Sequence, residues 1–149
     1  MTYARAGHTP LIYLPGPEAQ SDRATHVRIL APDGLVLGLK IDNGEMFERL
    51  LEEETIPLHA GDLVVFFTDG ISEAMNEADE FFGEGRLGLL AEEHAHLSSD
   101  ELRERLLREI DAFVGAAPQH DDMTMILLKV DDLGVRSAVD DAEAVEVVK

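Results

Sequence analysis

An apolar stretch in the middle of the chain, residues 63–67, constrains the fold more than any other part of the sequence. It follows a Gly-Asp turn and leads directly into Thr68-Asp69-Gly70. A short run rich in Val and Phe, bounded by turn residues, is typical of a strand buried on both faces. We therefore expect Asp69 at the end of a rigid strand, where its carboxylate can bind a metal ion or activate a water molecule. Gly70 would let the chain turn sharply and a ligand approach the backbone.

Composition narrows the functional classes. A chain of 149 residues, 45% of them hydrophobic, predicts one domain with a hydrophobic core. No run approaches the ~20 apolar residues of a membrane span, which argues against membrane insertion. The absence of cysteine excludes disulfides, thiolate metal sites and cysteine nucleophiles, and is compatible with a cytoplasmic location. The net charge of -19 argues against nucleic acid as a partner, since nucleic acid binds basic patches. This charge suits cation binding, although an acidic proteome would give it without functional meaning.

The first third of the chain is divided by turn residues into short elements. Strands are expected over residues 1–6 and 11–14, joined as a hairpin, and over residues 25–30. Residues 46–55 fit either a helix or an extended segment, and the turns on both sides favour a strand.

The second half of the chain has clearer signals. Residues 76–85 form a predicted loop whose Phe81 and Phe82 are expected to dock on the core, and a helix is expected over 86–94. Ser98 and Glu101 fit the capping box of a further helix, which Gly115 would end. A second apolar strand is expected over 123–130.

A second carboxylate stands at the near end of that last strand, in Asp121-Asp122. If the strands over 63–67 and 123–130 are antiparallel neighbours, Asp69 and Asp121 fall at the same edge of the sheet. Mg²⁺ and Mn²⁺ prefer such oxygen ligands, and two metals held between carboxylates can bind a phosphate and activate a water. The alternative is plain surface charge, because the chain holds 31 acidic residues and three Asp-Asp pairs.

Four motifs, in this order and spacing, resemble the PP2C-type (PPM) serine/threonine phosphatases of bacterial partner-switching systems, the sporulation stage II E and sigma-B-regulator phosphatases. They are Ala6-Gly7-His8-Thr9-Pro10, Phe67-Thr-Asp-Gly-Ile-Ser-Glu-Ala-Met-Asn76, Phe81-Phe-Gly-Glu-Gly-Arg-Leu87 and Gln119-His-Asp-Asp-Met-Thr-Met-Ile-Leu-Leu128. The resemblance runs from Thr2 to about Val130. It implies an α/β fold with a β-sandwich flanked by helices and a centre of two Mn²⁺ or Mg²⁺ ions.

The resemblance also implies roles for particular residues. Asp69 and Asp121 match the metal-binding aspartates of the family, and Asp122 is a weaker candidate beside Asp121. Gly70 matches the glycine next to the first ligand, and Glu73 lines up with a carboxylate that helps hold a further metal in some relatives. A second shell would contain His8, in the Ala-Gly-His turn, and His120, next to Asp121.

The activity implied is removal of phosphate from a serine or threonine of a small anti-sigma-factor antagonist of the STAS type, in the cytoplasm, by metal-activated water. The sequence departs from the family in one respect: nothing in it matches the Gly-Asp-Val-Ser-Gly-His-Gly segment, which supplies a bridging aspartate. Residues 1–130 are therefore expected to be the C-terminal portion of the domain, incomplete at its N-terminus, followed by an acidic tail over 131–149. The missing strand would leave a sheet edge open for pairing with a second copy of the chain.

Two alternatives remain at this point. The first is a catalytically inactive phosphatase-like module that keeps the fold and acts by binding a partner protein. The second is an unrelated acidic α/β binding module with a coincidental Thr-Asp-Gly, in which Asp69 and Asp121 would lie far apart.

Overall fold

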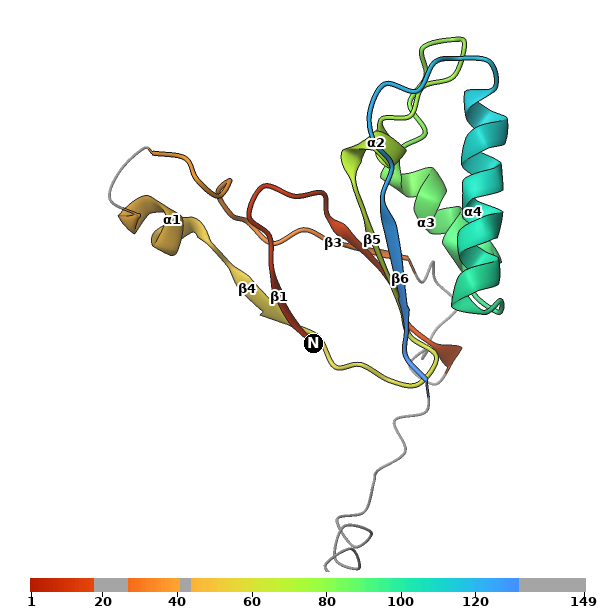
Figure 1. Ribbon diagram of the computed structural model, residues 1–149. Helices are drawn as coiled ribbons and strands as arrows, with labels where there is room; N and C mark the ends of the chain where they lie inside the picture. The colour runs from red at the N-terminus through yellow and green to blue at the C-terminus, as the bar shows by residue number, and fades with distance from the viewer. Residues whose placement is uncertain (18–26, 41–43, 132–149) are drawn as a thin grey trace, which may run out of the picture.

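The computed structural model describes residues 1–17, 27–40 and 44–131, which form a mixed α/β protein around antiparallel sheets (Figure 1). The tail expected over 131–149 lies outside the described residues except for its first. In the described part, no helix has the length and apolar character needed to cross a membrane. In chain order the elements are β1 (Thr2–Ala4), β2 (Leu11–Leu14), β3 (Arg28–Leu30), α1 (Glu45–Leu50), β4 (Glu53–Thr55), β5 (Leu63–Phe67), α2 (Asp69–Ser72), α3 (Glu84–Glu93), α4 (Ser99–Val114) and β6 (Met125–Lys129).

The main sheet has the strand order β3-β2-β5-β6, and every neighbouring pair is antiparallel. β5 lies between β2 and β6, and the prediction of a strand buried on both faces is confirmed. Val65 faces a core shared with α3 and α4, whereas Val64 faces a smaller cluster on the other side; both are fully buried. Figure 1 shows α3 and α4 together on one side of this sheet.

A second sheet of two strands, β1 and β4, lies on the side of the main sheet away from α3 and α4 (Figure 1). Its register pairs Thr2 with Thr55, and the Met1 ammonium donates to the Ile56 carbonyl at 2.7 Å. Ile56 packs with Tyr13 and Val64 in the smaller cluster. The two sheets and the helices on one side give the α/β class expected from the sequence.

α4, the longest helix among the described residues, confirms the prediction made from its capping box. The Ser98 side chain accepts from the Glu101 N–H, and the Glu101 carboxylate accepts from the Ser98 N–H at 3.1 Å. Its inner face places Leu102, Leu106 and Ile110 fully inside the core. Gly115, with φ of 62°, ends the helix as expected.

A buried carboxylate fixes the turn that precedes β5. Asp62 is fully buried and accepts hydrogen bonds from the Tyr13 hydroxyl at 2.8 Å, the Gly16 N–H at 2.7 Å and the His59 N–H at 2.8 Å. Burial, reinforced by the hydrogen bond to Asp62 and by its charge, raises the pKa of Tyr13 to about 12. Three donors on one carboxylate thus tie β2 and its following loop to the start of the central strand.

The predicted hairpin of residues 1–6 and 11–14 is wrong, although both strands exist. β1 pairs with β4, and β2 pairs with β3 and β5. Long-range bonds hold the segment between them: Arg5 Nε donates to the Pro32 carbonyl at 3.2 Å, and the Thr9 hydroxyl donates to the Phe67 carbonyl. These contacts fix the segment that connects the two sheets. Because they involve residues far away in the sequence, the turn residues alone do not predict them.

Two further expectations need correction. The strand favoured over 46–55 is present only at its end, as β4, and the first part is the helix α1. α1 begins directly after Gly44, and Gly44 itself has a left-handed backbone conformation with φ of 97°. Its glutamates lie in the first turn and Arg49 in the last, the arrangement that the helix dipole favours. Of the two phenylalanines expected to dock on the core, Phe82 does so, but Phe81 is 60% exposed. The strand expected over 25–30 appears as β3, with residues 25 and 26 outside the described part.

Candidate functional site

The pairing of β5 with β6 brings together the two segments that carry the candidate carboxylates. The strands are antiparallel, as the proposed edge requires, and their last paired residues are Phe67 and Met125. Thr68 then extends the ladder: its N–H donates to the Thr124 carbonyl at 3.1 Å and its hydroxyl accepts from the Thr124 N–H at 3.0 Å. The same hydroxyl lies 3.1 Å from the Asp122 carbonyl, to which it donates. One side chain therefore joins the start of α2 to the loop before β6.

Gly70 is buried where these two segments touch. A β-carbon on Gly70 would lie 2.4 Å from the Asp122 carbonyl oxygen, 2.9 Å from its carbonyl carbon and 3.3 Å from the Asp121 carbonyl carbon. These atoms are backbone and cannot rotate away. The glycine is therefore required for the approach of the chain after β5 to the Asp121-Asp122 peptide.

The two candidate ligands, Asp69 and Asp121, have matching local geometry. Asp69 is the first residue of α2, and its Oδ1 accepts from the Gly70 N–H at 3.0 Å. Asp121 Oδ1 accepts from the Asp122 N–H at 2.7 Å. Each hydrogen bond orients one carboxylate oxygen, and because both side chains are exposed the other oxygen can reach solvent or a ligand.

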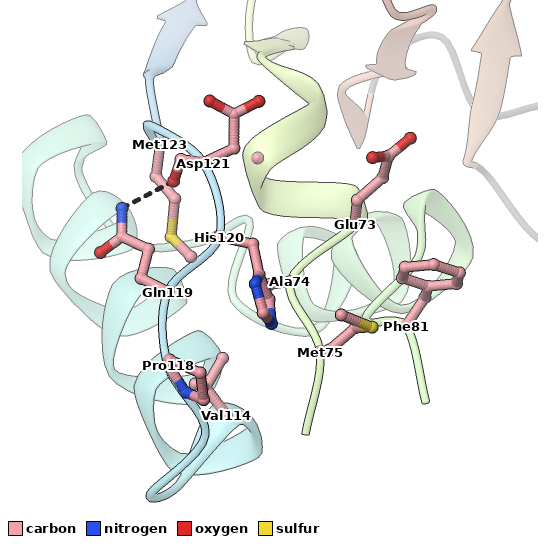
Figure 2. Close-up of a pocket in the computed structure, with 11 residues that line it drawn as sticks. Glu73, Ala74, Met75, Phe81, Val114, Pro118, Gln119, His120, Asp121 and Met123 are labelled. Atoms are coloured by element: carbon pink, nitrogen blue, oxygen red, sulfur yellow. Dashed lines mark hydrogen bonds between the residues drawn. The ribbon is translucent and has the colours of Figure 1, made fainter. Parts of the chain in front are cut away.

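A cavity of about 240 Å³ opens beside Asp121. Gly70, Glu73 and His120 line it together with Asp121, and Asp69 does not. Figure 2 shows the carboxylates of Asp121 and Glu73 on either side of α2, both pointing the same way, with the His120 ring reaching toward Ala74. Glu73 is held at the end of α2, where its N–H donates to the Asp69 carbonyl at 2.7 Å. Four of the predicted site residues thus line one cavity.

The remaining predicted residues do not line the cavity. Asp122 is exposed, and its main chain contacts Gly70 and Thr68. His8 is exposed; its ring lies 3.0 Å from the Thr9 hydroxyl and does not line the cavity. The loop of His8 is attached next to the site, because Thr9 donates to the carbonyl of the last β5 residue.

Two threonines that position the site were missed by reading the sequence. In the sequence, Thr68 stands out only as part of the Thr-Asp-Gly motif, and Thr9 only as a turn residue. A threonine directly after a buried strand does offer a signal, since its hydroxyl can continue a ladder that the main chain leaves. The partner strand, however, is more than 50 residues away in the sequence.

The donor chemistry suits a hard divalent cation. Asp69 and Asp121 offer exposed carboxylate oxygens, the ligands that Mg²⁺ and Mn²⁺ prefer, and Gly70 keeps the backbone clear beside them. Within the described ranges, no group of three or more His, Asp or Glu side chains is close enough to hold a metal. Since such cations take about six oxygen ligands, these residues would form part of a coordination shell rather than all of it.

The fold defines the class of protein to which the chain is similar. The SiaA-PP2C domain of Pseudomonas aeruginosa matches with a TM-score of 0.62 and 23% identity, covering 87% of this chain and 47% of that one. The RsbU and RsbW domains of a Mycobacterium tuberculosis protein match with a TM-score of 0.54 and 20% identity, covering 87% of this chain and 32% of that one. The fold is therefore that of a PP2C phosphatase domain.

The sequence comparisons identify the family. The model of the stage II sporulation protein E (SpoIIE) family matches residues 1–131. Phosphoserine phosphatase RsbU of Bacillus subtilis (strain 168) is 33% identical over 132 residues, which are 86% of this chain and 34% of RsbU. The chain belongs to the SpoIIE family, which confirms the resemblance and rules out an unrelated binding module. It spans about a third of RsbU and about half of the SiaA domain.

Proposed function

We propose that this chain carries one side of the catalytic centre of a PP2C-type protein serine/threonine phosphatase. The substrate class is phosphoserine or phosphothreonine on an anti-sigma-factor antagonist of the STAS type. The proposal depends on one observation: the segment that contains Asp69 and the segment that contains Asp121 lie in contact at one edge of the sheet. Thr68 joins the two segments by hydrogen bonds, and Gly70 packs against the Asp121-Asp122 main chain. Membership in the SpoIIE family, which includes phosphatases such as RsbU, supports the reaction type.

In this proposal Asp69 and Asp121 hold Mn²⁺ or Mg²⁺, and Glu73 and Asp122 are candidates for further contacts. When bound, a divalent cation would neutralise the phosphoryl charge and lower the pKa of the attacking water. The chain's own residues orient the ligands: the Gly70 and Asp122 N–H groups each fix one carboxylate oxygen. His8 and His120 are assigned to the second shell. The acidic surface makes nucleic acid an unsuitable partner. In this proposal the phosphoprotein substrate binds at the edge of the sheet that carries Asp69 and Asp121, on the side where the cavity opens.

The test combines calorimetric Mn²⁺ binding with Mn²⁺-dependent hydrolysis of p-nitrophenyl phosphate, for the parent chain and for Asp69→Asn. Asp111→Asn, an exposed aspartate on α4, serves as the matched control. We expect Asp69→Asn to weaken Mn²⁺ binding at least tenfold, the least that loss of a supporting residue costs at metal sites, and to abolish turnover. Asp111→Asn should behave as the parent.

Mn²⁺ affinity unchanged by Asp69→Asn would reject the site. Metal binding that depends on Asp69 without any turnover would instead favour the alternative, a catalytically inactive module that acts by binding a partner protein. Pairing with a second copy of the chain through an open sheet edge, the homodimer expected from the sequence, would be detected as a dimer in the same preparations.

A further inference from the structure

The cavity beside Asp121 has an apolar wall that metal binding does not use. Besides the polar residues already described, Met75, Phe81 and Met123 line it (Figure 2). Its volume, about 240 Å³, is below the ~300–1,000 Å³ typical of pockets for small organic ligands. A space of this size suits a single side chain better than a separate small molecule.

Phe81 is the unusual member of this wall. It is 60% exposed, although its neighbour Phe82 is 3% exposed and packs in the core. An exposed aromatic ring in a cavity that two flexible thioethers also line is typical of a surface that receives an apolar group. Figure 2 places the Phe81 ring next to Met75, across the cavity from the loop of His120.

The segment that presents Phe81 is held in place before any ligand binds. Met75 and Phe81 form an antiparallel bridge, and the Phe82 N–H donates to the Ala74 carbonyl at 2.8 Å. In the turn between them, Asn76 Oδ1 accepts from the N–H groups of residues 78 and 80 at 2.9 and 3.0 Å. Because the turn is already ordered, docking against Phe81 would require little further loss of conformational entropy.

Charge further restricts what can enter. Exposed Glu77, Asp79 and Glu80 occupy the turn that leads from Met75 to Phe81. An acidic side chain beside Phe81 would meet the like charges of this turn, whereas an apolar side chain would meet an apolar wall. The cavity therefore selects against Asp and Glu and in favour of residues such as Leu.

We propose that this cavity is a specificity subsite that receives an apolar side chain close to the phosphorylated residue of the protein substrate, with Phe81 as its main wall. The inference rests on the proposed function, because it places the phosphoryl group at Asp121. Asp121 lines the cavity itself, and consecutive residues of an extended peptide are ~3.3–3.6 Å apart. Because Asp121 and Phe81 line the same cavity, the proposal places a neighbour of the phosphorylated residue against Phe81 and the phosphoryl group at Asp121.

The test uses one host phosphoserine peptide in three versions, in which the two residues on each side of phosphoserine are Leu, Ala or Asp. Phosphate release is measured with Mn²⁺ as kcat/KM, and binding of each unphosphorylated twin is measured by fluorescence anisotropy. Phe81→Ala is compared with Phe81→Leu and with Leu89→Ala, which truncates an apolar side chain of similar exposure (57%) on α3.

We expect the parent to prefer the Leu peptide over the Asp peptide by about tenfold in kcat/KM, the effect of a modest hydrophobic contact. Phe81→Ala should remove most of this preference, while Phe81→Leu keeps part of it and Leu89→Ala all of it. Hydrolysis of all three peptides at equal rates, or equal losses in Phe81→Ala and Leu89→Ala, would overturn the subsite and leave the proposed function standing. A different result would separate the two proposals. If the parent binds the Leu peptides, Phe81→Ala weakens that binding and no phosphate is released, the subsite is supported and the catalytic proposal is overturned.

Discussion

Replacing Gly70 by alanine tests the geometry of the candidate site most directly. The new β-carbon would lie 2.4 Å from the Asp122 carbonyl oxygen, and contacts of this kind below 3.0 Å are essentially absent from proteins. Gly70 does not have a positive φ, so the backbone conformation itself suits alanine. The whole cost therefore comes from separating two backbone segments by at least about 0.6 Å.

The size of the effect follows from what that movement breaks. The hydrogen bond from the Thr68 hydroxyl to the Asp122 carbonyl is 3.1 Å long, and a lengthening of about 0.6 Å takes it beyond hydrogen-bonding range. Overpacking of this kind costs about 1–3 kcal/mol of unfolding free energy. The lower conformational entropy of alanine in the unfolded chain would return at most about 1 kcal/mol. Asp121 moves with its neighbour, so its carboxylate leaves its position relative to Asp69.

The assay pairs urea unfolding with calorimetric Mn²⁺ binding, and Gly85→Ala is the matched control. Gly85 lies in α3, lacks a positive φ and has no atom within 4 Å of its β-carbon position. Because alanine favours a helix by about 0.8–1 kcal/mol over glycine, Gly85→Ala should equal or exceed the parent in stability. Gly70→Ala should lower both the urea midpoint and the Mn²⁺ affinity.

Two results would refute this reasoning in different ways. If Gly70→Ala unfolds at the same urea concentration as the parent, the close approach of α2 to the loop before β6 is wrong. If stability falls but Mn²⁺ affinity does not, the packing is right and the Asp121 position is not important for the metal.

Two further predictions concern the buried carboxylate and its tyrosine. Asp62→Ala should lower the unfolding free energy by about 3–5 kcal/mol, because three donors, two of them in buried hydrogen bonds, lose their acceptor. A loss below about 1 kcal/mol in urea unfolding would contradict this. In the folded protein, burial and hydrogen bonding to carboxylates raise the pKa of both Tyr13 and Tyr3 to about 12. As the pH rises, the unfolded chain therefore loses its tyrosine protons before the folded protein does. The free energy of unfolding should be independent of tyrosine ionisation below pH 10 and fall between pH 10 and about 12. Tyr13→Phe should remove about half of that decline in urea titrations over this pH range, and a slope equal to that of the parent would show that Tyr13 is not protected.

The parts of the fold that the sequence predicts are those set by local rules. β5 is predictable because an unbroken apolar run is compatible with few environments other than a central strand. α4 is predictable because its capping box, apolar stripe and terminal glycine all lie within 18 residues of one another. In both cases the residues that predict the element are close in sequence to the residues whose interactions form it.

Pairing partners far apart in the sequence could not be predicted in this way. β1 pairs with a strand about 50 residues later, and Phe81 and Phe82, identical in type, differ in exposure by more than half of their surface. The direction of each side chain depends on the bridge to Met75 and on the helices packed behind Phe82. For the site, carboxylates at strand ends were predictable from position, whereas the Thr68 bridge and the Gly70 contact required the register of β5 and β6.

That register explains why the candidate ligands hold their positions. Met125 and Leu127 point from β6 into the core with α3 and α4, while Ile126, 60% exposed, points to the other face. A slip of one residue would exchange these faces and remove apolar surface from the core, so burial sets the register. The same register aligns Thr68 with Thr124 and brings the Asp121-Asp122 peptide against Gly70. The candidate carboxylates are therefore positioned by hydrophobic packing and by Thr68, not by attraction to a ligand.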